Sequence, residues 1–321
     1  MNKEIGGFFE LELSQNEEYH PFAIRLNKAR SALYYILKTK KINKVYLPYY
    51  MGSSIPEPVK ALKIDYELYR IDNSFYPIFN KTVGKQECFL YINYFGLYNQ
   101  NVKKVVTNIK NVIIDNTQAF FESPLPNIDT IYSARKFFGV PDGGYLYTNT
   151  ILKEALEIDY SYNRLQFLAK RIDCSASESY SLYQKHEELL TNETPKFMST
   201  FTHRMLKSID YEQVKKRRNE NFLYLHNQLQ IINELDFDTT NLNGPMIYPL
   251  LIRQDNIKQF LIQNNIYVAT YWKEVLSYTE VDWFEYQLAT HLIALPIDQR
   301  YSLQEMQHII AVLKKMNLKI N

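Results

Sequence analysis

Apolar runs alternate with amphipathic stretches along the first 150 residues of the chain. Helices are predicted at 24–41, where Ile24, Leu26, Ala29, Leu33, Ile36 and Leu37 recur near one face, and also at 55–63 and 101–110. Strands are predicted in six segments between and after them: 44–50, 65–72, 87–96, 111–120, 127–136 and 143–149. Strands that alternate with helices indicate right-handed β-α-β units, so the sequence predicts an α/β fold with a mostly parallel central sheet.

The pattern changes after residue 150. Residues 151–235 are predicted to be mostly helical, and a second α/β pattern follows them. Its predicted elements are a strand at 246–253, a helix at 256–265, strands at 266–272 and 291–297, and a closing amphipathic helix at 302–316. We therefore expect a large domain over 1–210, with an N-terminal arm and a helical 151–210 segment, and a small C-terminal α/β domain over 211–321.

Composition narrows the class of protein. The 321 residues include 37 Lys and Arg against 35 Asp and Glu, a balance that gives no reason to expect nucleic acid or an anionic membrane as partner. Cys88 and Cys174 are the only cysteines, which excludes a disulfide framework and a cysteine-based zinc site. The N-terminus lacks the pattern of a signal peptide, and no apolar run approaches the roughly 20 residues of a membrane helix. We expect a soluble cytoplasmic protein.

Three polar residues follow predicted strands of the sheet. Asp115 comes directly after the apolar residues 112–114, Gln118 comes three residues later, and Lys136 stands at the end of the next predicted strand in an apolar stretch. Ligands of parallel sheets bind beyond the carboxyl ends of the strands, so we expect the three to meet at one rim. Singly, such an Asp is usually a strand-end cap and such a lysine is usually solvated.

An acid, an amide and a lysine together are what a pyridoxal 5'-phosphate (PLP) enzyme needs. The lysine forms a Schiff base, the acid keeps the pyridinium nitrogen protonated, and the amide hydrogen-bonds the ring hydroxyl. The phosphate needs backbone N–H groups at a helix start and a hydroxyl, for which residues 29–33 and Ser133 are candidates.

These segments resemble the DegT/DnrJ/EryC1/StrS sugar aminotransferases, within the fold type I PLP-dependent enzymes. "VIIDNTQAF" resembles the family's Asp-x-x-Gln segment, and "YSARKFFGVPDGG" resembles its Schiff-base segment with a serine before the lysine and a Gly-Gly turn after it. "RSALYYIL" resembles the phosphate-binding helix start, and "ALPIDQRYSLQEMQHII" resembles the closing segment. The resemblance spans nearly the whole chain.

The resemblance implies a role for each matching residue. Lys136 would carry the Schiff base and move the proton, and Asp115 would pair with the pyridinium nitrogen. The implied cofactor contacts, besides these two catalytic residues, are Gln118 to the ring oxygen, Ser31, Ser133 and the amides near Arg30 to the phosphate, Tyr50 (preferred over Tyr49) on the ring face, and Ser199 against the partner's phosphate. This set implies a homodimer with shared active sites.

The implied function is transfer of an amino group from an amino acid such as glutamate to a keto-sugar nucleotide, for surface polysaccharide or related biosynthesis. Three alternatives stay open: a transaminase acting on a non-nucleotide substrate, a PLP-binding member without catalysis, and an unrelated α/β protein. The six histidines show no metal-ligand spacing, so no metal is expected. Trp272, after a small-domain strand, lies where the family often closes over the substrate, and edge packing explains it equally well.

Overall fold

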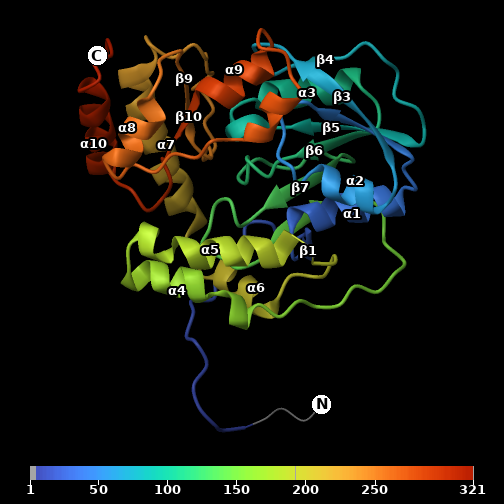
Figure 1. The fold of residues 1–321 in the computed structure, drawn as a ribbon. Coiled ribbons are helices and arrows are strands. Elements are labelled where there is room, and N and C mark those ends of the chain that lie inside the picture. The colour runs from blue at the N-terminus through green and yellow to red at the C-terminus, as the bar shows by residue number, and fades with distance from the viewer. Residues whose placement is uncertain (1–4, 192, 321) are drawn as a thin grey trace.

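The computed structural model describes residues 5–191 and 193–320. Its centre is an eight-stranded sheet in the order β1-β8-β7-β6-β5-β2-β3-β4 (Figure 1). The strands are β1 (Ile24–Leu26), β2 (Lys44–Pro48), β3 (Asp65–Ile71), β4 (Pro77–Ile78), β5 (Glu87–Ile92), β6 (Val112–Asp115), β7 (Asp129–Ser133) and β8 (Gly144–Tyr147). The pairs β2–β3, β2–β5, β5–β6 and β6–β7 are parallel, and β1, β4 and β8 pair antiparallel. The predicted α/β class with a mostly parallel sheet is confirmed.

The helices of this first part connect the parallel strands. They are α1 (Ala29–Thr39), α2 (Pro56–Ala61), the 3-10 turn η1 (Tyr94–Gly96) and α3 (Asn99–Asn108). The prediction that the first helix begins at residue 24 is wrong. Ile24 pairs with Leu146 at the sheet edge, and Lys28 has extended backbone angles (φ −147°, ψ 155°), so pairing with β8 overrides the helical spacing of the apolar residues.

The second part is helical before it returns to strands. Its elements are η2 (Tyr162–Arg164), α4 (Gln166–Asp173), α5 (Ala176–Thr191), α6 (Thr200–Lys207), α7 (Tyr211–Leu229), β9 (Tyr248–Leu251), α8 (Ile257–Gln263), η3 (Lys273–Ser277), α9 (Phe284–His291), β10 (Leu292–Leu295) and α10 (Leu303–Lys314). β9 and β10 form a separate antiparallel pair. The strand predicted at 266–272 is wrong, because only Ala269 bridges to Ala294 and the chain then turns through Trp272 at a positive φ of 56°.

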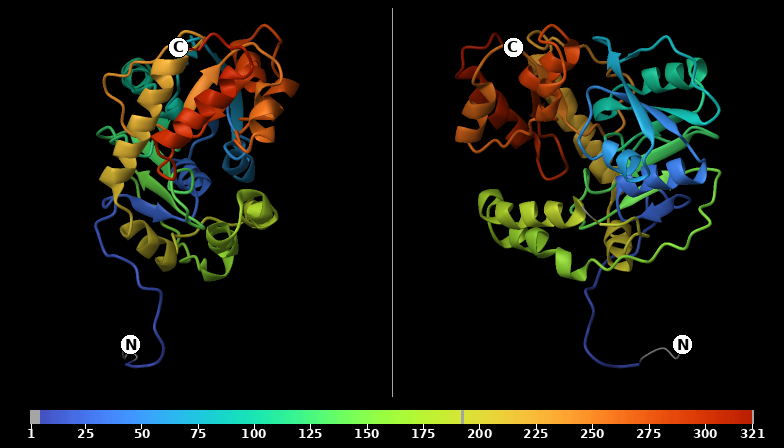
Figure 2. Two further views of the ribbon diagram at one scale, coloured as in Figure 1. Left: turned by 90° about the vertical axis from the view of Figure 1, so that its left-hand side faces the viewer. Right: turned by 45° about the vertical axis from the view of Figure 1, so that its right-hand side comes forward.

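The C-terminal unit and the α4–α5 hairpin lie beside the sheet. Figure 2 shows the hairpin below the C-terminal helices, and residues 5–17 run away from the body as an extended arm. α7 begins at Tyr211, where the boundary between the large and small domains is predicted; that division stays a prediction.

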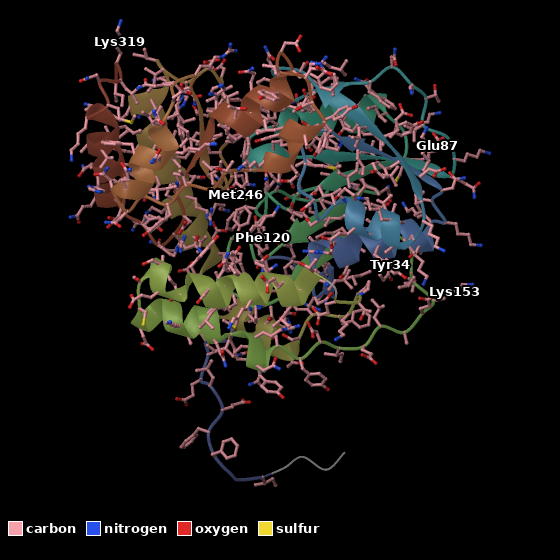
Figure 3. The ribbon with its side chains drawn as sticks, in the orientation of Figure 1. Tyr34, Glu87, Phe120, Lys153, Met246 and Lys319 are labelled. Atoms are coloured by element: carbon pink, nitrogen blue, oxygen red, sulfur yellow. The ribbon has the colours of Figure 1, made fainter. Side chains whose placement is uncertain are left out.

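The core is continuous from the sheet to the C-terminal unit. All residues of β6 and β7 are buried, as expected for parallel strands covered on both faces. Figure 3 shows Phe120 and Met246 in the interior, whereas Lys153 and Lys319 project at the periphery. Buried strands therefore carry their carboxyl-end residues on a rigid support.

Candidate functional site

A cavity of about 370 Å³ lies where β6 and β7 end. Its floor includes Asp115, Ser133 and Lys136, one side is the start of α1, and another side is the α4–α5 hairpin. Trp272 reaches it from the C-terminal part of the chain. A cavity of this volume falls in the range of small-molecule sites, and its place at the carboxyl ends of parallel strands is the one predicted.

Asp115, Thr117 and Lys136 form a connected polar group on the floor. The Lys136 Nζ donates to Thr117 Oγ1 at 2.9 Å, and the Thr117 backbone N–H donates to Asp115 Oδ1 at 2.8 Å. The second bond is an Asx turn that fixes the chain as it leaves β6. The predicted pair of acid and lysine therefore meets at one rim, with Thr117 between the two residues.

The surroundings of Lys136 shift its pKa downward, which is the direction that favours the neutral amine. Desolvation by the surrounding protein lowers the pKa of Lys136. The Asp115 carboxylate raises this pKa, and the Arg135 charge lowers it further. A neutral amine is the form that attacks a carbonyl carbon. Solvent still reaches the side chain through the cavity, so the amine is accessible to a ligand.

Two glycines follow the lysine because the chain must pass tightly beside α1. Gly143 has a φ of +126°, which is strained for residues with a side chain. A Cβ on Gly144 would lie 2.5 Å from the Lys28 carbonyl carbon, so only glycine lets β8 approach the start of α1 this closely. The Gly-Gly turn thus places the lysine loop against the helix start.

Gln118 and Arg30 also line the cavity, as predicted. The Gln118 Oε1 accepts the Phe95 backbone N–H at 2.8 Å, so its NH₂ group is the part left to donate to a ligand. Arg30 forms an ion pair with Glu57 of α2. The guanidinium is therefore directed toward α2.

Three predicted residues are not brought to the cavity. Ser31 is buried and donates to Asn27 Oδ1 at 2.8 Å. Tyr50 is fully buried and packs edge-on against Trp272, with ring centroids 4.5 Å apart. Trp272 lines the cavity in front of it, so Tyr50 does not contribute the ring face there. The residues next to Tyr50 in the sequence carry no information about its packing against Trp272, which comes from a distant part of the chain.

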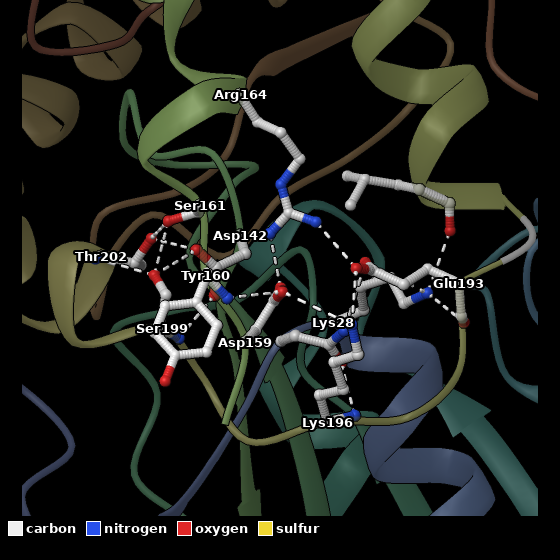
Figure 4. Close-up of polar contacts among 12 residues, drawn as sticks. Lys28, Asp142, Asp159, Tyr160, Ser161, Arg164, Glu193, Lys196, Ser199 and Thr202 are labelled. Atoms are coloured by element: carbon white, nitrogen blue, oxygen red, sulfur yellow. Dashed lines mark hydrogen bonds and ion pairs between the residues drawn. The ribbon is translucent and has the colours of Figure 1, made fainter. Parts of the chain in front are cut away.

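Ser199, the third of these residues, is the buried N-cap of α6. Its hydroxyl donates to Asp142 Oδ1 at 2.8 Å and accepts the Thr202 backbone N–H at 3.0 Å (Figure 4). These bonds lie within the same chain and leave the side chain 1% exposed. The geometry gives Ser199 a capping role, and a contact with a partner's phosphate would require these bonds to break.

Lys28 joins the start of α1 to the end of the hairpin. Its Nζ donates to the carbonyl oxygens of Leu190, at 2.9 Å, and Glu193, at 2.6 Å (Figure 4). Burial lowers the pKa of Lys28 to about 8, against the opposing effect of the Glu193 carboxylate. Sequence reasoning missed this residue because nothing local distinguishes it from a solvated lysine.

Arg218 and Gln299 hold the loop that follows Lys136. The Phe137 carbonyl accepts Gln299 Nε2 at 2.7 Å, and the Arg218 guanidinium lies 4.6 Å from the centre of the Phe137 ring. Arg218 also donates to the Pro245 and Met246 carbonyls at 3.1 Å. Arg218 is 2% exposed, and this burial follows only from the fold.

No group of three or more His, Cys, Asp or Glu within 5–191 and 193–320 is placed to hold a metal ion. No helix in this described part of the chain has the length and apolar character needed to cross a membrane.

Solved structures share this fold at low sequence identity. The DegT DnrJ EryC1 StrS aminotransferase from Brucella abortus is 15% identical, with a TM-score of 0.62 over 92% of this chain and 85% of its own. PseC of Helicobacter pylori, an aminotransferase involved in the biosynthesis of pseudoaminic acid, is 15% identical, with a TM-score of 0.58 over 91% and 86%. Spr1654 of Streptococcus pneumoniae, in its PLP form, is 14% identical, with a TM-score of 0.61 over 91% and 86%.

The chain has the fold of the sugar aminotransferases. This confirms the fold class that the resemblance implied, fold type I of the PLP-dependent enzymes. No protein-family model and no curated protein matches the sequence. At identities of 15% or less the likeness is one of fold, and the activity has to be argued from the site.

Proposed function

We propose that the chain is a PLP-dependent aminotransferase that moves an amino group from an amino acid such as glutamate to a keto-sugar nucleotide. The observation that carries the proposal is the Lys136–Thr117–Asp115 group at the carboxyl ends of β6 and β7. It occurs in the fold shared with the B. abortus and H. pylori aminotransferases, at the carboxyl ends of parallel strands, where open α/β sheets bind ligands. Surface polysaccharide or related biosynthesis is the pathway class we propose for the product.

The residues present fit pyridoxal phosphate. Lys136 supplies an amine whose pKa is lowered, Asp115 supplies a buried carboxylate for a ring nitrogen, and the start of α1 with Ser133 supplies donors for a phosphate. When bound, the cofactor supplies the electron sink for transamination. The protein's own part is to hold the ring against Asp115 and to move a proton at the Lys136 Nζ.

Thr117 gives the proton-moving group a fixed resting position. Its hydroxyl accepts the hydrogen bond from Lys136 while its backbone is tied to Asp115. The lysine is thereby directed back toward the same rim after each turnover. Trp272 and the α4–α5 hairpin line the cavity above this floor.

The test begins with cofactor uptake. The purified chain should take up pyridoxal phosphate with a visible absorption band that borohydride removes, and Lys136→Ala should lack that lysine-bound band. Glutamate should then bleach the wild-type band, and a keto-sugar nucleotide should restore it. A chain that takes up no cofactor would overturn the proposal, and restoration only by non-sugar keto acids would change the substrate class.

We propose a homodimer as the working assembly. Ile5, Phe8 and Phe9 on the extended arm are each at least 95% exposed, and apolar groups exposed to this extent usually mark interfaces. Closed two-fold symmetry is the commonest arrangement for such contacts. Light scattering should give twice the chain mass, and a monomer that binds cofactor tightly would exclude a shared site.

A further inference from the structure

An ion pair inside the cavity has no part in the floor just described. Arg135 immediately precedes Lys136, and its guanidinium pairs with Glu187 of α5. Both residues line the cavity, with Arg135 18% and Glu187 37% exposed. The Arg135 Nε is buried and has no hydrogen-bond partner, so the guanidinium is not fully satisfied by Glu187.

The existing ion pair with Glu187 shows that the Arg135 guanidinium binds a carboxylate at this place. Its planar set of donors matches a carboxylate, with two parallel hydrogen bonds in the best geometry. A partly exposed pair of this kind contributes little net stability, so exchange of one carboxylate for another costs little free energy. Glu187 belongs to a helix with few buried residues, and it can yield its place without disturbing the core.

The other cationic side chains around the cavity are engaged differently. Arg30 is tied to Glu57 of α2, and the Lys28 Nζ is held by the Leu190 and Glu193 carbonyls. Both lie at the start of α1, where the phosphate is proposed to bind. Arg135 instead precedes the lysine and pairs with Glu187 of the hairpin, away from the α1 start.

We propose that Arg135 binds the carboxylate of the amino donor, and that Glu187 holds the guanidinium in the cavity until the donor displaces it. This inference rests on the proposed aminotransferase function. A donor that reacts next to the Lys136 amine carries its carboxylate two bonds from its nitrogen. Arg135 precedes Lys136 and lines the same cavity, so its guanidinium is available to a carboxylate bound there. The substrate class it selects is an α-amino acid.

The test measures binding separately from turnover. Glutarate, a dicarboxylate with no amino group, is titrated calorimetrically into the PLP-loaded chain, and the KM for glutamate is measured alongside it. Arg135→Gln should weaken glutarate binding and raise the glutamate KM by roughly tenfold or more, with Arg135→Lys intermediate. Glu187→Gln should tighten glutarate binding several-fold, because it removes the competing carboxylate. Arg253→Gln, in the exposed Arg253–Glu234 pair, is the matched control and should change neither value.

Each remaining outcome contradicts a defined part of the inference. Unchanged glutarate affinity in Arg135→Gln, with the cofactor band intact, would overturn the inference and leave the aminotransferase function standing. Weaker glutarate binding in Glu187→Gln would show that the pair is structural. An effect on the acceptor KM alone would assign Arg135 to an acidic acceptor instead. A wild-type chain that takes up no pyridoxal phosphate would overturn the function and the inference together.

Discussion

The strands beneath the cavity and the helical hairpin beside it differ most in how much of each is buried. Every residue of β6 and β7 is buried, whereas α4 has no buried residue and α5 buries only Ser179, His186 and Leu190. Few buried contacts mean low local stability, so the hairpin is expected to open more readily than the sheet. The floor is therefore the rigid side of the cavity, and the hairpin is the side that is expected to adapt more readily.

The comparison predicts its largest effect for Lys136→Ala. Loss of the floor amine should reduce transamination by on the order of a thousandfold or more, because no other group takes over its attack and proton transfer. Steady-state rates with glutamate measure this loss, and Lys104→Ala on the exposed side of α3 is the control. A rate near that of the wild type would remove Lys136, and with it the floor, from the chemistry.

Asp115→Asn should have the next largest effect. The substitution keeps the shape but removes the charge that would hold the cofactor's ring nitrogen protonated. We expect turnover to fall roughly a hundredfold, about 3 kcal/mol of transition-state stabilisation, with the fold retained. Stopped-flow rates and circular dichroism test the two parts, and Asp65→Asn, exposed at the start of β3, should behave as wild type. An unaltered rate would make Asp115 only a turn residue.

Arg218→Met tests whether the loop that follows Lys136 depends on its contacts with Arg218 of α7. The change leaves the Pro245 and Met246 carbonyls without their donor, so the free energy of unfolding should fall by about 3 kcal/mol. Chemical denaturation measures the loss, with the half-buried neighbour in Arg217→Met as control. If stability is unchanged, the lysine loop does not need this support.

Tyr183→Ala tests the hairpin, where a smaller effect is expected. Tyr183 lines the cavity but is 43% exposed. The acceptor KM should rise about fivefold, close to 1 kcal/mol, while turnover and stability stay near the wild-type values. Tyr180→Ala, on the same helix and away from the cavity, should change neither constant. A large fall in turnover would show that the hairpin belongs to the chemistry as well.

The smallest expected effect is a shift in the pH dependence of pyridoxal phosphate uptake. It tests the electrostatic link between Lys136 on the floor and Arg135, which pairs with the hairpin. The Arg135 charge lowers the pKa of Lys136, so Arg135→Gln should raise that pKa. The apo-protein would then need a higher pH to present the neutral amine. The rate of pyridoxal phosphate uptake against pH should move toward higher pH in Arg135→Gln and stay in place in Arg253→Gln. A shift to lower pH would contradict the assigned direction.

Local sequence patterns were sufficient to predict most of the fold and the meeting of Asp115 with Lys136. Alternating strands and helices predict the parallel sheet, and Asp115 and Lys136 follow strands that must end at one rim, so their meeting follows from topology. The same patterns failed at residues 24–26 and 266–272. In both places, long-range pairing or its absence decided the structure, and periodicity within a short segment carries no information about partners.

The amino-acid sequence by itself determined the parallel strands, the helices between them and the acid–lysine pair, because the alternation of apolar and amphipathic segments along the chain encodes β-α-β units. Only the tertiary structure decided which side chains surround that pair. Three contacts each join positions separated by 50 residues or more in the chain. They are the packing of Trp272 on Tyr50, the hydrogen bond of Arg218 to Phe137 and the Arg135–Glu187 pair. The burial of Ser199 was decided in the same way, since its cap on α6 is closed by Asp142. Packing sets these neighbours, and no local spacing encodes them.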